Sequence, residues 1–125
     1  MTASKPGLST VIWLGCLLGA FTLTHWPPPE DPLPQPISDK VLHVIGFVVL
    51  GLVTSHRFAR GPQSRRTGVF LLVWVGLAGY AALDELTQPF VGRMCEFADW
   101  LADLFGALAG LSIIMARNTL RSSAS

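Results

Sequence analysis

Four apolar stretches, separated by short polar or proline-rich segments, make up most of the chain. The first, residues 8–26, holds 19 residues without a formal charge. At about 1.5 Å per helical residue it extends about 28 Å, close to the roughly 30 Å of a bilayer's hydrocarbon core. The alternative is a cleaved signal peptide, but no small-residue cleavage motif precedes the prolines that begin at Pro27. We therefore expect a spanning helix.

Three further helices are expected at residues 39–58, 67–88 and 96–116. Ser38 can cap the second and Asp39 lies in its first turn, while Pro89 prevents easy continuation of the third. Asp99 and Asp103 fall in the first two turns of the fourth. These three helices reach spanning length only if their charged turns are included, and such turns need protein or water around them.

The connections differ in composition. Residues 27–36 contain six of the nine prolines, which predicts an extended polyproline segment. Residues 57–66 carry four arginines, residues 89–95 form a short turn with Gly92 and Arg93, and the Ser-rich tail 117–125 is expected to be disordered.

The composition agrees with a membrane protein. The chain is 50% hydrophobic and only 14% charged, with a mean hydropathy of +0.49, which is too apolar for an ordinary soluble domain. Its net charge of +1 gives no general electrostatic basis for binding nucleic acid. We predict an all-α membrane protein: one domain, residues 1–125, forming a four-transmembrane-helix antiparallel bundle in contact with membrane lipids.

The basic residues predict the orientation. With four spans, seven of the nine lie on the side of the two termini: Lys5, Arg57, Arg60, Arg65, Arg66, Arg117 and Arg121. The positive-inside rule then places both termini in the cytoplasm. The acidic residues fall on the opposite side or in helix ends next to it.

Polar residues are expected to gather at that opposite, outer end. In an antiparallel bundle the start of the second helix, the end of the third and the start of the fourth share one depth, and pairs four residues apart point along one helix face. The candidate site comprises Asp39, Lys40, His43, Asp84, Glu85, Gln88, Arg93, Asp99 and Asp103. We expect one water-accessible cluster, in which Arg93 pairs with Glu85 or Asp99. It comprises His43, Glu85, Gln88, Arg93, Asp99 and Asp103.

Some of these residues have simpler interpretations. Asp39, Asp84 and Glu85 can flank helix ends in the headgroup region, and Lys40 can extend to headgroups. His25, at the end of the first helix, is interpreted as a residue of the membrane–water interface. Gly106 and Gly110 continue the face of Asp103 and allow close helix packing.

The polar positions also resemble a known family. The motifs are Asp39-Lys40-x-x-His43-x-x-x-Phe47, Asp84-Glu85-x-x-Gln88 followed by Gly92-Arg93, and Asp99-x-x-x-Asp103-x-x-Gly106-x-x-x-Gly110. In this order they are similar to the VanZ-like family of small bacterial membrane proteins. Two features depart from the family pattern: Asp103 stands where Asn is more frequent, and the turn between Gln88 and Arg93 is one residue shorter. The resemblance implies a bacterial inner membrane and a link to resistance against teicoplanin-type glycopeptides, but no reaction.

Four functions remain open at this point. The first is a protein that binds or modulates an anionic or amphipathic envelope component, with Lys40 and Arg93 donating charge-assisted hydrogen bonds. The second is an enzyme acting on a lipid-linked substrate, with Glu85 or Asp99 as general base and His43 as acid, base or metal ligand. No H-E-x-x-H or G-x-S-x-G motif supports it. The others are a structural or partner subunit and a proton-coupled transporter.

Overall fold

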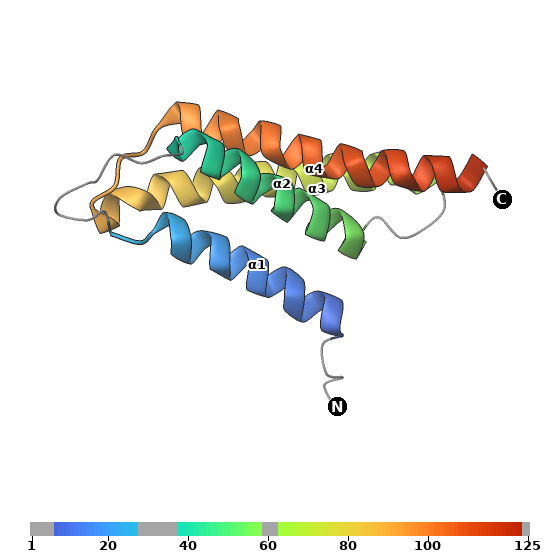
Figure 1. The fold of residues 1–125 in the computed structure, drawn as a ribbon, viewed down its shortest axis with the longest axis horizontal. Helices are drawn as coiled ribbons and strands as arrows, with labels where there is room; N and C mark the ends of the chain where they lie inside the picture. The colour runs from blue at the N-terminus through green and yellow to red at the C-terminus, as the bar shows by residue number, and fades with distance from the viewer. Residues whose placement is uncertain (1–6, 28–37, 59–62, 124–125) are drawn as a thin grey trace.

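The computed structural model describes residues 7–27, 38–58 and 63–123. In that part of the chain the fold is entirely helical, with α1 (Leu8–Thr24), α2 (Asp39–Phe58), α3 (Gln63–Thr87), the short 3-10 helix η1 (Gln88–Val91) and α4 (Phe97–Ser123). Successive helices run in opposite directions, so the ends of α1 and α3 lie beside the starts of α2 and α4 (Figure 1). The all-α antiparallel bundle is therefore confirmed.

In the described part of the chain, three of the four α-helices are long and apolar enough to cross a membrane: Asp39–Phe58, Thr67–Val91 and Phe97–Arg121. The remaining α-helix, α1, is apolar but shorter, with 17 residues. It ends two residues before the predicted boundary at residue 26, and α3 begins at Gln63 rather than at residue 67. The predicted polyproline segment falls almost wholly outside the described residues.

The prediction of a disordered tail is wrong for residues 117–123, because α4 continues to Ser123. The sequence contains no Gly or Pro after Gly110, and so no residue in 117–123 breaks the helix. Thr119 Oγ1 donates a hydrogen bond to the carbonyl oxygen of Met115, so the Thr119 hydroxyl has a hydrogen-bond acceptor within the helix.

Helices α2 and α4 meet through glycines. A Cβ added to Gly106 would lie 2.5 Å from the carbonyl oxygen of Val44, and one added to Gly51 would lie 2.6 Å from that of Ala107. At Gly110 a Cβ would overlap the carbonyl oxygen of Val48. The two backbones can approach this closely only because these positions carry no side chain.

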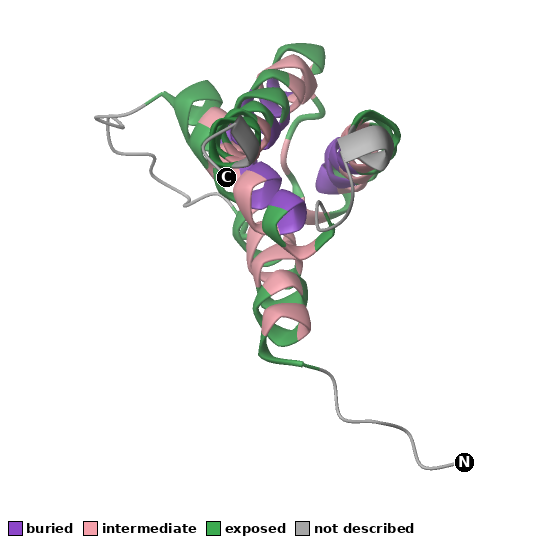
Figure 2. Ribbon diagram, turned by 90° about the vertical axis from the view of Figure 1, so that its right-hand side faces the viewer, coloured by how far each residue is buried: buried purple, intermediate pink, exposed green. Residues whose placement is uncertain are grey.

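The apolar core adjoins this contact. Phe47 and Leu50 of α2 pack with Leu77 and Ala81 of α3 and Ala107 of α4. Figure 2 shows the buried residues along the facing sides of the helices, with exposed residues on their outer sides. An exposed apolar exterior around a buried core is the arrangement expected of helices in lipid.

Helix α1 packs less closely and contains no buried residue. Side-chain hydrogen bonds attach it: Trp13 Nε1 donates to Thr54 Oγ1 at 3.1 Å, and the Tyr80 hydroxyl donates to the carbonyl oxygen of Leu17 at 2.7 Å. A cavity of about 310 Å³ lies between α1, α2 and α3, lined by residues that include Leu17, Phe58 and Leu77.

Candidate functional site

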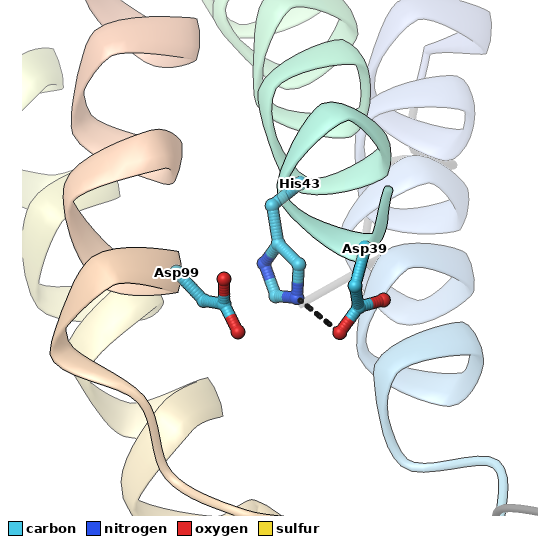
Figure 3. Close-up of side chains that lie close together, drawn as sticks. All are labelled: Asp39, His43 and Asp99. Carbon is cyan, nitrogen blue, oxygen red and sulfur yellow. Dashed lines mark ion pairs between the residues drawn. The ribbon is translucent and has the colours of Figure 1, made fainter. Parts of the chain in front are cut away.

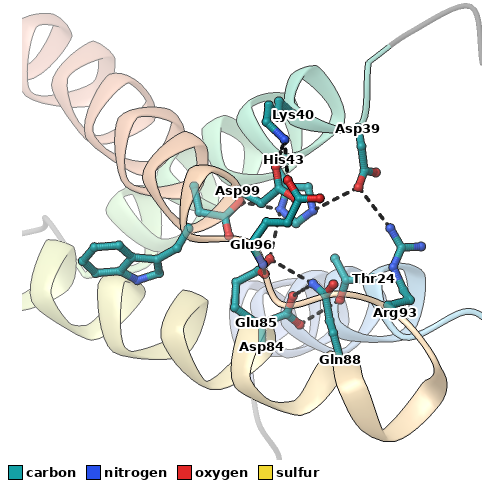
Figure 4. Close-up of polar contacts among 12 residues, drawn as sticks. Thr24, Asp39, Lys40, His43, Asp84, Glu85, Gln88, Arg93, Glu96 and Asp99 are labelled. Carbon is teal, nitrogen blue, oxygen red and sulfur yellow. Dashed lines mark hydrogen bonds and ion pairs between the residues drawn. The ribbon is translucent and has the colours of Figure 1, made fainter.

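All nine residues of the predicted cluster lie at the common end of the helices. Contacts of 4.0 Å or less connect them, with Glu96 joining Lys40 and Asp99 to the rest. Figure 4 shows these contacts for all of them but Asp103. Six of them are buried: His43, Asp84, Glu85, Gln88, Asp99 and Asp103. Asp39 and Lys40 are exposed and Arg93 is partly exposed. The expectation of a water-accessible cluster is therefore wrong for five of its six residues, because all of them except Arg93 are buried.

The most buried part consists of His43, Glu85 and Asp103, which we call the inner triad. His43 Nδ1 lies 2.9 Å from Asp103 Oδ1 and 3.8 Å from Glu85 Oε1. The three residues come from α2, α3 and α4, and none is more than 6% exposed. Asp103 Oδ2 has no hydrogen-bond partner among the residues that the structure describes.

Hydrogen bonds from two directions fix the carboxylate of Glu85. Gln88 Nε2 donates to Glu85 Oε1 at 2.9 Å, and the backbone N–H of Glu96 donates to Glu85 Oε2 at 3.1 Å. Gln88 is held at the start of η1, and the chain then turns through Gly92, whose φ of 79° is readily adopted only by glycine. The turn thus brings the start of α4 against the end of α3.

Asp84 connects the cluster to α1. Thr24 Oγ1 donates to Asp84 Oδ1 at 2.8 Å, and Gln88 Nε2 lies 3.4 Å from Asp84 Oδ2. His25 Nδ1 lies 3.6 Å from Asp84 Oδ1, and its Nε2 is 2.8 Å from Thr87 Oγ1. The last turn of α1 therefore reaches a buried carboxylate of α3.

Four less buried residues form what we call the mouth: Asp39, Lys40, Arg93 and Glu96. Lys40 Nζ donates to Glu96 Oε2 at 2.8 Å and lies 3.0 Å from Asp99 Oδ1, which connects the mouth to the buried part. The Lys40 ammonium lowers the pKa of Glu96, which projects from the turn before α4. Figure 3 shows His43 between Asp39 and Asp99, with its Nε2 4.0 Å from Asp39 Oδ2.

The predicted partner of Arg93 is wrong. Arg93 Nη2 donates to Asp39 Oδ2 at 3.1 Å, not to Glu85 or Asp99. The backbone N–H of Arg93 bonds back to the carbonyl oxygen of Gln88, which ends the turn and leaves the residue beside the start of α2. Glu85 instead accepts hydrogen bonds from Gln88 and from the backbone N–H of Glu96, and Asp99 contacts Lys40.

The sequence of this chain matches a known family model. Its residues 10–119 match the sequence profile of the VanZ/LLP1 family, a span that runs from α1 to the last turns of α4. The chain belongs to the VanZ/LLP1 family. No curated protein and no solved structure matches it. The match includes α1, which lies outside the motifs that first indicated the resemblance.

The cluster of this VanZ/LLP1 protein includes three residues that the sequence analysis did not assign to it: Thr24, His25 and Glu96. His25 is an internal partner of Asp84 and Thr87, which its interpretation as an interface residue missed. The signal was available, since alternating helix direction places the end of α1 at the same depth as the other polar ends. Glu96 precedes α4 by one residue at that same depth.

The cluster contains more carboxylates than side chains that always carry a positive charge. Its six carboxylates are Asp39, Asp84, Glu85, Glu96, Asp99 and Asp103, whereas only Lys40 and Arg93 among its members always carry a positive charge. Among the residues that the structure describes, two groups have the residue types and spacing to hold a metal ion: Asp39, His43 and Asp99, and the inner triad. The carboxylates of this VanZ/LLP1 cluster thus outnumber its permanent cations by four.

Proposed function

We propose that this VanZ/LLP1 protein binds an amphipathic component of the cell envelope at the mouth, through a positively charged group of that component. The observation that carries the proposal is that both permanent cations of the cluster already contact carboxylates, Lys40 with Glu96 and Asp99 and Arg93 with Asp39. An anionic group would have to displace those carboxylates. Arg93 contacts Oδ2 of Asp39 and Lys40 contacts Oε2 of Glu96, and both carboxylates are partly exposed, so a cationic group can share them and reduce the excess of negative charge in the cluster as a whole.

The surface beside the mouth supports an amphipathic ligand. Phe90 of η1 is 87% exposed, and Phe97, the first residue of α4, is 69% exposed. Val41 and Leu42, in the first turn of α2, are also exposed. An apolar chain can lie against these side chains within the membrane while its polar group reaches Asp39 and Glu96.

Two amphiphiles with the same apolar chain and opposite charge test the proposal: dodecylamine and dodecyl phosphate, titrated against the protein in lipid nanodiscs. We expect the amine to bind more tightly, and the Asp39→Asn substitution to reduce that preference severalfold. His56→Asn, at the other end of α2, is the matched control and should leave the preference unchanged. Equal affinity for both amphiphiles, or tighter binding of the phosphate, would contradict the proposal.

We further propose that the protein resides in the bacterial inner membrane with both termini in the cytoplasm, and that it contributes to teicoplanin resistance. The support is the family membership and the distribution of Lys and Arg. A reporter fused after Ser125 should be active as a cytoplasmic fusion. Expression in a glycopeptide-susceptible bacterium should raise the teicoplanin concentration that stops growth, and Asp99→Asn should remove that effect at equal protein level. Loss of the effect in parallel with loss of folded protein would instead assign Asp99 a structural role.

A membrane enzyme acting on a lipid-linked substrate is the second candidate, favoured by the short contact between His43 and Asp103. A carboxylate on Nδ1 orients an imidazole and leaves Nε2 able to accept a proton, as in catalytic His–Asp pairs. The Nε2 atom faces Asp39 at the mouth. Turnover of a lipid-linked envelope precursor by purified protein, abolished by His43→Gln, would favour this candidate over simple binding.

A further inference from the structure

The ligand proposed above binds at the mouth and does not involve the three residues of the inner triad. We propose that His43, Glu85 and Asp103 bind one divalent metal ion. The three side chains come from three different helices, yet one ligand atom from each lies within 4.8 Å of the other two. The sequence separates His43 from Asp103 by 60 positions, and so no local motif signals this grouping.

The spacing of the three ligand atoms suits a metal. With metal–ligand bonds of about 2.0–2.2 Å, neighbouring ligand atoms lie about 3 Å apart and opposite ones about 4.2 Å apart in octahedral coordination. His43 Nδ1 is 2.9 Å from Asp103 Oδ1 and 3.8 Å from Glu85 Oε1. The third separation, between the ligand atoms of Glu85 and Asp103, is within 4.8 Å.

Charge provides an independent argument. Asp103 is completely buried, Glu85 is 3% exposed, and neither pairs with a Lys or Arg among the described residues. Two such carboxylates, buried away from solvent, need protons or a bound cation, because leaving both charged without a cation is costly. Asp103 Oδ2 accepts no hydrogen bond from any described residue and so retains a free coordinating position.

The other candidate group, Asp39, His43 and Asp99, is less suitable. Its two carboxylates already have cations, since Arg93 contacts Asp39 and Lys40 contacts Asp99. A metal there would have to displace both. The inner triad instead has the supporting hydrogen bonds that orient metal ligands, because Gln88 and the Glu96 backbone hold Glu85.

One imidazole nitrogen and two carboxylate oxygens form a donor set suited to Mn²⁺ or Zn²⁺. Three protein ligands leave at least one coordination position for water or for a group of another molecule. The ion would therefore also provide a positive charge beneath the mouth, within the same cluster.

Metal content of the purified protein tests the proposal. After treatment with a chelator, the protein in detergent is incubated with Mn²⁺ or Zn²⁺, dialysed and analysed by elemental mass spectrometry. We expect about one equivalent per chain for the wild type and for His56→Asn, and at least a tenfold loss for Asp103→Asn and for Glu85→Gln. No stoichiometric uptake of either metal by the wild type overturns the proposal, as does full retention by both triad variants.

A measurement on the wild type alone remains informative if a variant fails to fold. The spin-echo spectrum of bound Mn²⁺ should contain the coupling of one histidine nitrogen. Bound Mn²⁺ without nitrogen coupling would lie on carboxylates elsewhere and would overturn the assignment. Neither experiment contains dodecylamine or dodecyl phosphate, and so their outcome is separate from that of the proposed ligand binding at the mouth.

Discussion

The contact between α2 and α4 differs from the attachment of α1. The first is a contact of backbones, in which Gly51, Gly106 and Gly110 leave no space for a side chain. The second consists of separate side-chain hydrogen bonds, such as those of Trp13 and Tyr80, beside a cavity of about 310 Å³. In a membrane, where lipid solvates apolar side chains as well as protein does, close packing stabilises the first contact and polar groups stabilise the second.

This difference determines how the cluster is built. His43 and Asp103 lie on the two helices that the glycines hold together, and so their separation is fixed by backbone contact. Helix α1 contributes only its last turn, through Thr24 and His25 at Asp84. We therefore expect the inner triad to tolerate changes in α1 and to be sensitive to the glycines.

The largest effect is expected for Gly110→Val, whose Cβ would overlap the backbone of Val48. Backbone cannot rotate away as a side chain can, and so we expect a loss of about 3 kcal/mol or more in the free energy of unfolding. Folded protein in detergent, measured by size-exclusion chromatography, should fall sharply. Gly46→Ala on α2, where a Cβ meets nothing within 4 Å, is the control and should be neutral or stabilising by up to about 1 kcal/mol. Similar losses for both would contradict the importance of the close contact.

A smaller effect is expected for Asp84→Ala, which removes the acceptor of Thr24 and Gln88. The buried amide of Gln88 would lose one of its two acceptors, and we expect a loss of about 1–2 kcal/mol in the free energy of unfolding. Asp84→Asn keeps one acceptor oxygen and should lose less. Helix α1 should become more accessible to protease in Asp84→Ala while stoichiometric metal uptake persists. Loss of the metal as well would show that α1 and the inner triad are coupled.

A single interhelical hydrogen bond is removed by Tyr80→Phe, which leaves the carbonyl oxygen of Leu17 without that donor. Such bonds in membrane proteins average about 0.6 kcal/mol. A titration with denaturing detergent should detect a stability loss of about this size. A loss as large as that of Gly110→Val would mean that polar contacts hold α1 as firmly as the glycines hold α2 and α4.

The smallest effect concerns the exposed ion pair at the mouth. Lys40 lowers the pKa of Glu96 below its ordinary value of 4.5, and so the contribution of this contact is complete above pH 4.5 and is lost as the pH falls through the lower folded-state pKa. The carboxyl carbon resonance of Glu96 should titrate with a midpoint below 4.5 in the wild type and close to 4.5 in Lys40→Met. Identical midpoints would mean that the two side chains do not interact in solution.

The positions of the helices and the common depth of the polar residues follow from the sequence. Apolar stretches of spanning length alternate in direction, and this places the polar ends of α2, α3 and α4 together. The fold class and all nine clustered residues could therefore be predicted. The extent of α4 could not, because a Ser-rich composition suggested disorder where no residue actually breaks the helix.

The partners within the cluster were decided only by the tertiary structure. Which face of each helix points inward depends on rotation about its axis, and the glycines between α2 and α4 set that rotation through backbone contacts. The left-handed turn at Gly92 directs Arg93 to Asp39, while Glu85 is taken by Gln88 and the backbone of Glu96. Asp103 thus remains without a Lys or Arg partner among the described residues. The sequence predicts the depth of a side chain to within one helical turn, about 5.4 Å, whereas pairing and metal coordination depend on differences of less than about 1 Å.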